Sequence, residues 1–164
     1  MKQTFSSAAT SINKDRLPAI YSKVTFNSFS RVLDYGCGKY TDHIKAATPA
    51  DHFPYDPYNQ PDSVNANTRR ELTARPASAA VCSNVLNVID SDSAITDLLH
   101  DIASMVDGIL YVTVYEGTGK GNGKQTGPDQ YQRNMKIRDY VPLIAAAGYD
   151  CTVKNGVIRV YMQR

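Results

Sequence analysis

The sequence contains no tryptophan, only three cysteines and no long hydrophobic segment. Cys37, Cys82 and Cys151 lie far apart and form no Cys-x-x-Cys pair, which predicts reduced thiols and a cytoplasmic setting. No apolar run approaches the roughly 20 residues needed to cross a bilayer. The polar stretch at residues 1–10 also lacks the hydrophobic centre of a signal peptide. We therefore expect a soluble protein without a membrane partner.

Charge and histidine content are equally uninformative about a partner. The formal net charge is +2 over 164 residues, too small to indicate nucleic acid or a membrane surface. His43, His52 and His100 form no ligand pattern with nearby acids and cysteines, so no metal site is predicted. The length fits one domain with its own core, for which we expect an N-terminal helical segment at 1–30 and the functional domain at 31–164.

Strand-like and helix-like segments alternate along most of the chain. The best helical pattern covers 91–107, where Ile95, Leu98, Leu99 and Ile102 fall on one face. The dipeptide Asn155-Gly156 separates two β-prone runs and predicts a two-residue hairpin. By the same reasoning we expect strands at 32–35, 52–56, 79–84, 109–115, 150–154 and 157–161, and helices at 40–48 and 136–147.

Other segments give weaker signals. Residues 1–10 should be loosely attached, and 11–24 show a helical pattern broken by Pro18. Residues 57–76 show no sustained period, so a third strand there, near 63–66, would have to be short. Pro54 is unfavourable inside a strand unless little pairs on its far side. Together these segments predict an α/β domain with a mainly parallel sheet, and a ligand site at the carboxyl ends of its strands.

A glycine-containing turn follows the first predicted strand. Asp34, Gly36 and Gly38 form an Asp-x-Gly-x-Gly motif, and glycines let backbone N–H groups approach a ligand closely. An acidic residue at the strand tip would repel a phosphate but suits a positively charged ligand. Asp56 ends the next strand, where a carboxylate can accept both hydroxyls of a ribose. The alternative is an ordinary turn and an unrelated surface aspartate.

These motifs resemble those of the class I S-adenosylmethionine-dependent methyltransferases. Residues 32–38 resemble the first motif of that family, Asp56 its ribose-binding acid, and residues 82–89 its fourth motif. The resemblance covers most of 31–164 and implies a three-layer α/β sandwich with a mostly parallel, seven-stranded-type sheet and an antiparallel C-terminal hairpin. Residues 85–89 also resemble small methyltransferase-like proteins of bacteria and phages, some of them near DNA-modification systems.

The resemblance implies a role in cofactor binding for several positions. Gly36, Gly38 and the backbone around Tyr35 and Cys37 would flank the methionine moiety, with Asp34 near its ammonium group. Either Asn65 or Asn67 would reach the adenine edge, and Lys14 or Lys39 could pair with the carboxylate unless both are ordinary surface lysines. The remaining implied contacts are Asp56 to the ribose, Pro57 and Tyr58 to the adenine, and Ser83 and Asn84 on the opposite side.

The end of the fourth predicted strand carries the best candidates for catalysis. Tyr115 and Glu116 could serve as a base for a hydroxyl or amine acceptor, although a strand-end carboxylate often only caps a turn. Asn84 is not followed by the Pro-Pro-aromatic sequence with which amino-methylating nucleic-acid enzymes stack a flipped base. Cys82 lacks the Pro-Cys context of a nucleophile and fits a core position better.

A glycine-rich stretch at 117–127 follows these residues. It departs from a phosphate-binding loop, because Thr118 stands where a glycine belongs and Gln125 replaces the Ser or Thr. We expect a mobile loop that acts as a substrate lid. Residues 117–139 favour an acidic or phosphorylated acceptor, or else form a solvated basic face, because Asp129 and Asp139 are outnumbered by Lys120, Lys124, Arg133, Lys136 and Arg138.

The sequence thus predicts a methyltransferase that uses S-adenosylmethionine and an acceptor that is a small molecule or a nucleic acid. Methyl transfer needs mainly alignment and desolvation, since the sulfonium is already activated. Two alternatives remain: a non-catalytic subunit that binds the cofactor or a partner, and an enzyme that degrades the cofactor itself. A nicotinamide dehydrogenase is disfavoured because Thr41 occupies the third glycine position of Gly-x-Gly-x-x-Gly.

Overall fold

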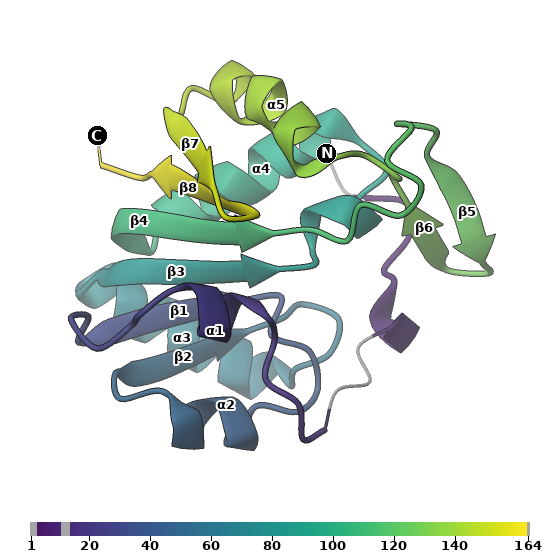
Figure 1. Cartoon of the computed structure of the whole chain (residues 1–164). Coiled ribbons are helices and arrows are strands. Elements are labelled where there is room, and N and C mark those ends of the chain that lie inside the picture. The colour runs from purple at the N-terminus through teal and green to yellow at the C-terminus, as the bar shows by residue number, and fades with distance from the viewer. Residues whose placement is uncertain (1–2, 11–13, 164) are drawn as a thin grey trace.

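A six-stranded sheet forms the centre of the molecule in the computed structural model, which describes residues 3–10 and 14–163 (Figure 1). The strand order is β2-β1-β3-β4-β8-β7. The first four strands are parallel, and β8 runs antiparallel to both β4 and β7. The strands are β1 Arg31–Tyr35, β2 Asp51–Tyr55, β3 Ala77–Ser83, β4 Val106–Thr113, β7 Cys151–Lys154 and β8 Val157–Tyr161.

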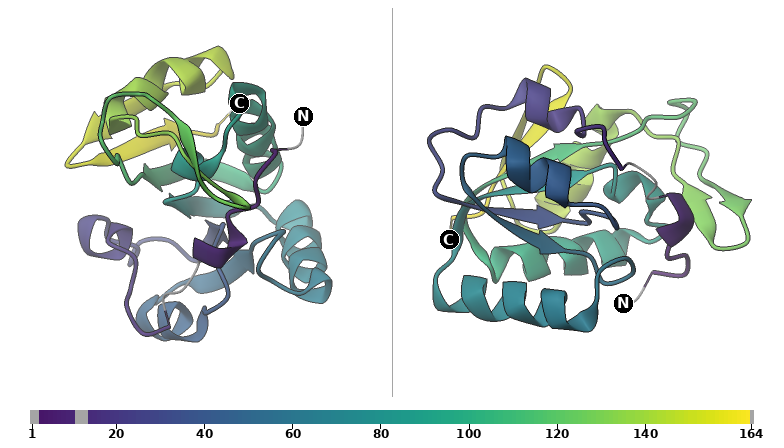
Figure 2. Two further views of the ribbon diagram at one scale, coloured as in Figure 1. Left: turned by 90° about the vertical axis from the view of Figure 1, so that its right-hand side faces the viewer. Right: turned by 90° about the horizontal axis from the view of Figure 1, so that it is seen from below.

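Helices cover both faces of this sheet and complete the predicted three layers. The larger core cluster joins alternate strand residues such as Leu33 and Leu110 to α3 (Asp62–Ala74), α4 (Asp92–Ala103) and α5 (Val141–Ala146). A smaller cluster on the other face joins Val32 and Tyr111 to α1 (Ile20–Lys23). Figure 2 shows α3 and α1 on opposite sides of the sheet. The mixed parallel and antiparallel sheet and its layers confirm the predicted fold class.

The strongest local patterns of the sequence are confirmed. All four apolar residues predicted for one face of α4 are buried, and Ser91 accepts a hydrogen bond from the Ala94 N–H at its start. Asn155 and Gly156 have φ values of 54° and 69°, as a two-residue turn between β7 and β8 requires. The predicted helix at 136–147 is present as a 3-10 turn, Ile137–Tyr140, followed by α5.

The segment at 57–76 differs from its prediction, because α3 occupies it and no strand forms at 63–66. Only Thr68 and Leu72 of this helix are buried, so its apolar stripe is too narrow to show in the sequence. Strand β2 is consequently an edge strand that pairs with β1 alone among the described residues. This position explains Pro54, which cannot donate a hydrogen bond to an outer neighbour.

The predicted glycine-rich loop and the N-terminal segment also differ from their predictions. Residues 124–132 form a separate hairpin, β5 (Lys124–Gly127) with β6 (Gln130–Gln132), where a mobile loop was expected. The described part of 11–24 contains one helical turn, α1, while Ser11 and Ile12 lie outside the described residues. Residues 3–10 contact β6 and were wrongly expected to be loose. Within the described chain, no helix is both long and apolar enough to span a bilayer.

Candidate functional site

A pocket of about 900 Å³ opens at the carboxyl ends of the parallel strands. The chain leaves β1 for β2 on one side and returns to β3 on the other, so the loops after β1 and β3 diverge here. Such a divergence leaves a crevice beside the sheet, which is the usual ligand position in open α/β folds. The pocket walls come from the ends of β1, β2, β3 and β4, from α4, and from residues before α1.

The loop after β1 presents backbone rather than side chain to the pocket. Gly36 and Gly38 both have a φ of 76°, which favours glycine. The Gly36 N–H donates to the Tyr55 carbonyl oxygen at 2.7 Å and ties the loop to β2. A Cβ on Gly36 would lie 2.3 Å from Cγ2 of Val85, so the loop is closed to a side chain at this point.

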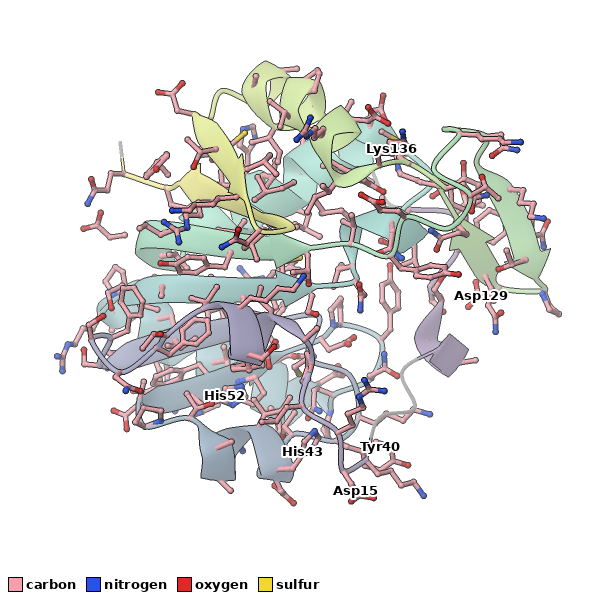
Figure 3. The ribbon with its side chains drawn as sticks, viewed as in Figure 1. Asp15, Tyr40, His43, His52, Asp129 and Lys136 are labelled. Carbon is pink, nitrogen blue, oxygen red and sulfur yellow. The ribbon has the colours of Figure 1, made fainter. Side chains whose placement is uncertain are left out.

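Asp34 lines the pocket, and contacts with the side chains of Tyr21 and His52 hold its carboxylate in place. Its Oδ2 accepts a hydrogen bond from the Tyr21 hydroxyl at 3.1 Å and lies 3.0 Å from Nε2 of His52. Figure 3 shows His52 on the β2 side of the molecule. Burial, and then the Asp34 charge, raise the pKa of Tyr21 well above its usual range, so this phenol stays protonated and keeps donating. Asp34 thereby braces β1 against β2 and α1 beneath the glycine loop.

Asp56 organises the loop after β2. It is 5% exposed, and its carboxylate accepts from the Gly38 N–H at 3.0 Å and the Tyr58 N–H at 2.9 Å. It also accepts from the backbone N–H and from the side-chain NH₂ of Asn59. The Asn65 side chain brackets the Asp56 backbone with two hydrogen bonds of 2.9 Å. The predicted ribose-binding acid therefore also joins the two ligand loops.

Pro57, Tyr58 and Asn59 follow Asp56 along the pocket wall. Tyr58 is 39% exposed, so much of its ring remains open to a ligand or to solvent. Asn67, the other candidate for the adenine edge, is exposed on α3 and accepts from Arg70 instead. The structure thus brings Asn65 to the site indirectly and leaves Asn67 outside it.

The opposite wall comes from the ends of β3 and β4. Ser83 and Thr113 share a hydrogen bond of 3.1 Å between their hydroxyls, and the Asn84 N–H donates to the Thr113 carbonyl at 2.8 Å. Asn84 has a φ of 57°, a conformation that non-glycine residues adopt rarely and often at functional sites. Ser83 and Asn84 both line the pocket, across from the glycine loop.

The two catalytic candidates separate in the structure. Tyr115 lines the pocket and is 64% exposed. Glu116 does not line it, and its Oε1 accepts a hydrogen bond of 2.8 Å from the Ile137 N–H. Glu116 therefore has the turn-capping contact that was its alternative reading.

The basic residues of 117–139 also lie away from the pocket lining. Arg133 pairs with Asp92 at 2.8 Å, and Figure 3 shows Lys136 on the α5 side, far from His43 and Tyr40. From this segment only Thr126, Tyr131 and Gln132 line the pocket. Lys14 lies over the Tyr40 ring at 5.4 Å, and neither it nor Lys39 lines the pocket. The acidic acceptor inferred from this charge stays a prediction.

Three buried polar atoms at the pocket have no hydrogen-bond partner in the part of the chain that the structure describes. They are Nε2 of His43, Oδ1 of Asn59 and Oδ1 of Asn87, and all three residues line the pocket. Buried polar atoms are nearly always paired in folded proteins. A polar ligand or water in the pocket could supply the missing partners.

Sequence reasoning missed several lining residues. Asn59 could have been noticed in Asp56-Pro57-Tyr58-Asn59, a typical turn in which an aspartate caps following N–H groups. Asp101 and Gln132 carry no such local signal, because tertiary packing alone brings them to the site. Asn87 lies within 82–89, the segment that resembled the fourth motif, but no role was predicted for it. No group of His, Cys, Asp or Glu suited to a metal ion occurs among residues 3–10 and 14–163.

Comparison with known proteins places the fold. No family model and no curated protein matches the sequence. A Methanosarcina mazei S-adenosylmethionine-dependent methyltransferase superposes with a TM-score of 0.59 at 11% identity, covering 92% of this chain and 100% of that one. The 1,6-didemethyltoxoflavin-N1-methyltransferase of Burkholderia thailandensis gives 0.58 at 16% identity, covering 82% and 71%. An O-methyltransferase family protein of the same organism gives 0.53 at 12% identity, covering 86% and 53%. The chain therefore has the fold of the class I S-adenosylmethionine-dependent methyltransferases.

Proposed function

We propose that this protein is an S-adenosylmethionine-dependent methyltransferase. The observation that carries the proposal is the meeting of the Asp34–Gly38 loop and Asp56 in one pocket, at the switch point of this fold. A hydrogen bond between Gly38 and Asp56 joins the two motifs that the sequence keeps apart. That contact is independent of the fold likeness, so the two lines of support reinforce each other.

The residues present fit the cofactor. Gly36 and Cys37 bring the loop after β1 to the pocket for the methionine part, and Asp34 adds negative charge beneath a cationic ligand. Asp56, Tyr58 and Asn59 form a polar and aromatic wall for the ribose and adenine, where Asn59 Oδ1 lacks a partner. When bound, S-adenosylmethionine supplies an activated methyl group on a sulfonium. This chain would bind and orient the cofactor and would exclude water from it.

Tyr115 is the best-placed side chain to meet the acceptor. It extends from the end of β4 into the pocket lining beside Asn84 and leaves most of its ring exposed. Its hydroxyl could hold a hydrogen bond to an amine or hydroxyl acceptor. We assign no proton transfer to Glu116, whose carboxylate caps the turn at Ile137.

The structural neighbours support the same cofactor. The Burkholderia N1-methyltransferase was crystallised with S-adenosylhomocysteine, the product that remains after methyl transfer. At 16% identity this likeness does not carry an acceptor across to our chain. Reduced cysteines support a cytoplasmic location. The acceptor is proposed only as a small molecule or a nucleic acid.

Calorimetric titration with S-adenosylhomocysteine tests the proposal first. We expect saturable binding at one site per chain, and an absence of heat would overturn the proposal. Incubation with methyl-labelled S-adenosylmethionine, alone and with small-molecule fractions or DNA, then separates the alternatives. A methyltransferase leaves the cofactor intact when no acceptor is added, and transfers the label to a component of one of the added fractions. Consumption of the cofactor alone indicates a degrading enzyme, and binding without any labelled product indicates a non-catalytic subunit.

A further inference from the structure

Asn87 lines the same pocket as the proposed cofactor site. It belongs to the 3-10 helix Leu86–Val88 after β3 and is 3% exposed. Its Nδ2 donates to Oε1 of Gln132 on β6 at 3.1 Å, and Nε2 of Gln132 donates to the Tyr115 carbonyl oxygen at 2.8 Å. This chain of two amides connects three separate segments at the pocket.

The same chain fixes which atom Asn87 turns to the ligand. The Tyr115 carbonyl can only accept, so Gln132 must direct its NH₂ group toward it. Gln132 therefore directs its oxygen toward Asn87, and Asn87 must donate to that oxygen through Nδ2. The remaining Oδ1 is buried and has no partner among the described residues. Flipping Asn87 alone would place its Oδ1 against Oε1 of Gln132, and flipping both amides would place Oε1 of Gln132 against the Tyr115 carbonyl oxygen. Each flip creates an oxygen–oxygen contact, so this acceptor is a property of the network.

A buried and unpartnered acceptor oxygen calls for a donor, because leaving it unpaired costs about 1–3 kcal/mol. We propose that Asn87 is a specificity-determining residue that accepts a hydrogen bond from an N–H or O–H group of the methyl acceptor. This inference rests on the proposed function and names the chemical class of the acceptor: a neutral or cationic molecule with a donor group. It selects against a carboxylate or phosphate at this position.

The charge of the pocket agrees with that class. Arg16 is the single Lys or Arg among the described lining residues, while four carboxylates line the same pocket, those of Asp34, Asp56, Asp97 and Asp101. Asp34 contacts His52 at 3.0 Å, and Asp101 pairs with Arg69 at 2.8 Å. An anionic acceptor would thus find one guanidinium, that of Arg16, in a lining that also carries four carboxylates. The basic residues of 117–139, which suggested an acidic acceptor, do not line the pocket.

The amide contacts link Asn87 to the hairpin and to the end of β4. Its partners are Gln132 and, through it, Tyr115. Ser7 also lies nearby, since its hydroxyl accepts from the N–H of Tyr131, the residue before Gln132. The donor of the ligand would therefore meet Asn87 beside the 3-10 helix Leu86–Val88, the β5–β6 hairpin and the N-terminal residues.

Indole and benzofuran are suitable probes, because the two rings have nearly the same shape and only indole carries an N–H donor. Each is titrated into protein saturated with S-adenosylhomocysteine, with benzoate as the anionic comparison. We expect indole to bind about five-fold more tightly than benzofuran, corresponding to about 1 kcal/mol for one hydrogen bond. Benzoate should bind most weakly. Equal affinities, tighter binding of benzoate, or no binding of indole at millimolar concentration would overturn the proposal.

Substitution then assigns the preference to the residue. Asn87→Leu should abolish the difference between indole and benzofuran, whereas Asn27→Leu, an exposed asparagine outside the pocket, should preserve it. Persistence of the preference in Asn87→Leu would contradict the assignment. If that variant does not fold, a structure of the wild-type indole complex decides, with an indole N to Asn87 Oδ1 distance of about 3 Å expected.

The cofactor titration keeps this inference distinct from the proposed function. Asn27→Leu should bind S-adenosylhomocysteine within about two-fold of the wild type, whereas Asn87→Leu removes the contact with Gln132 together with the proposed contact with the acceptor. Failure of the wild type to bind S-adenosylhomocysteine would refute the proposed function alone. The indole and benzofuran comparison on the unliganded protein would still test the subsite.

Discussion

Two buried aspartates illustrate how single residues shape this pocket. Asp34 and Asp56 are 3% and 5% exposed, and both end neighbouring parallel strands. Asp34 contacts side chains, His52 and Tyr21, whereas Asp56 mainly accepts from backbone N–H groups of both ligand loops. Asp34 therefore supports the sheet beneath the site, and Asp56 holds the loops that face the ligand.

Asp56→Ala should weaken both the fold and the binding of S-adenosylhomocysteine. Removing the carboxylate leaves the Gly38, Tyr58 and Asn59 N–H groups without their acceptor. We expect a loss of about 1–3 kcal/mol in the free energy of unfolding, measured by urea titration, and at least ten-fold weaker calorimetric binding. The exposed Asp51→Ala should change neither quantity.

The ribose role of Asp56 needs a separate test in the wild type. Deoxyribose analogues of S-adenosylhomocysteine should bind more weakly than the parent if the carboxylate also accepts ribose hydroxyls. Equal affinities would restrict Asp56 to its role in the loops.

Gly36→Ala should destabilise the protein more than Gly121→Ala. Both glycines have positive φ, 76° and 70°, so each alanine has a similar conformational cost of about 1–2 kcal/mol. Only at Gly36 would the new Cβ meet a neighbour, 2.3 Å from Val85, while nothing lies within 4 Å at Gly121. Gly36→Ala should also lose S-adenosylhomocysteine binding. Similar unfolding midpoints and affinities for the two variants would contradict this geometry.

The sequence was informative about residues whose role is local. Asp56 and the two glycines could be predicted from spacing, because a strand followed by a turn fixes their position without knowledge of other segments. The contact between Asn87 and Gln132 could not be predicted, because the two residues are 45 positions apart and meet only through packing of β6 on the turn after β3. The contact of Glu116 is likewise non-local, since its partner Ile137 is 21 residues away.

At the scale of elements, the N-terminal segment and the β5–β6 hairpin support each other. The Ser6 N–H donates to Oδ1 of Asp129 at 2.9 Å, and the Ser6 hydroxyl donates to the other oxygen. Phe5 stacks on Tyr131 with ring centroids 5.8 Å apart, and Ser6 and Ser7 line the pocket. The docked segment therefore completes one wall of the site through polar contacts and one aromatic stack.

Asp129→Ala should release residues 3–7 without unfolding the domain. Hydrogen bonds from Ser6 lower the pKa of Asp129, so docking is favoured by the ionised carboxylate. Because the docked pKa lies below the ordinary value of about 3.9, docking is complete above that value and weakens as the pH falls through the lower one. Amide hydrogen exchange at Ser6 and Ser7 reports it directly.

We expect faster exchange at these two amides in Asp129→Ala at pH values where Asp129 is ionised in the wild type, with the β3 and β4 amides unchanged. In the wild type, protection of the two amides should decrease only at acid pH. Asp107→Ala, on an exposed position of β4, provides the control. Unchanged protection in Asp129→Ala would contradict the role of this carboxylate and show that the remaining contacts hold the segment, among them the aromatic stack and the bond from the Ser7 N–H to the Asp129 carbonyl.

Elements with broad apolar faces or distinctive turns were predictable. Helix α4 buries Ile95, Leu98, Leu99 and Ile102, and the β7–β8 turn has the residues its geometry requires. Helix α3 was missed because only Thr68 and Leu72 are buried, which gives no sustained period. The β5–β6 hairpin was missed because its strands are exposed or half-buried and contribute no alternating apolar pattern.

On the scale of the whole molecule, the pocket depends on a sheet of six strands whose first crossovers run in opposite directions. The sheet ends at β2, where Pro54 and the helix α3 take the place of a further strand. The class of fold followed from the alternation of elements, whereas the number of strands depended on the weak segment at 57–76. The core reaches from this edge to β7 through contacts on both faces.

Cys82 reports on the stability of this whole unit. It lies on β3 with no exposed surface, and burial together with Asp34 raises the pKa of its thiol well above the usual range. We expect Cys82 to react with iodoacetamide only after global opening, while the partly exposed Cys151 reacts faster. Mass spectrometry of the labelled peptides distinguishes the two sites.

S-Adenosylhomocysteine at 100 times its Kd should slow the labelling of Cys82, because binding to the folded state alone adds about 2.7 kcal/mol of stability. In the regime where opening and closing are fast, this corresponds to about a hundred-fold lower rate. Cys151 labelling should change much less. Rapid labelling of Cys82 in the native protein would contradict its burial.

A crystal structure with S-adenosylhomocysteine tests the central claim most directly. We expect ligand density in the pocket between the Gly36–Cys37 loop and Ser83–Asn84, with the ribose beside Asp56 and the adenine near Tyr58. Tyr115 should remain exposed to an acceptor, and Oδ1 of Asn87 should remain without a protein partner. Ligand density elsewhere, or none in crystals grown at saturating S-adenosylhomocysteine, would contradict it.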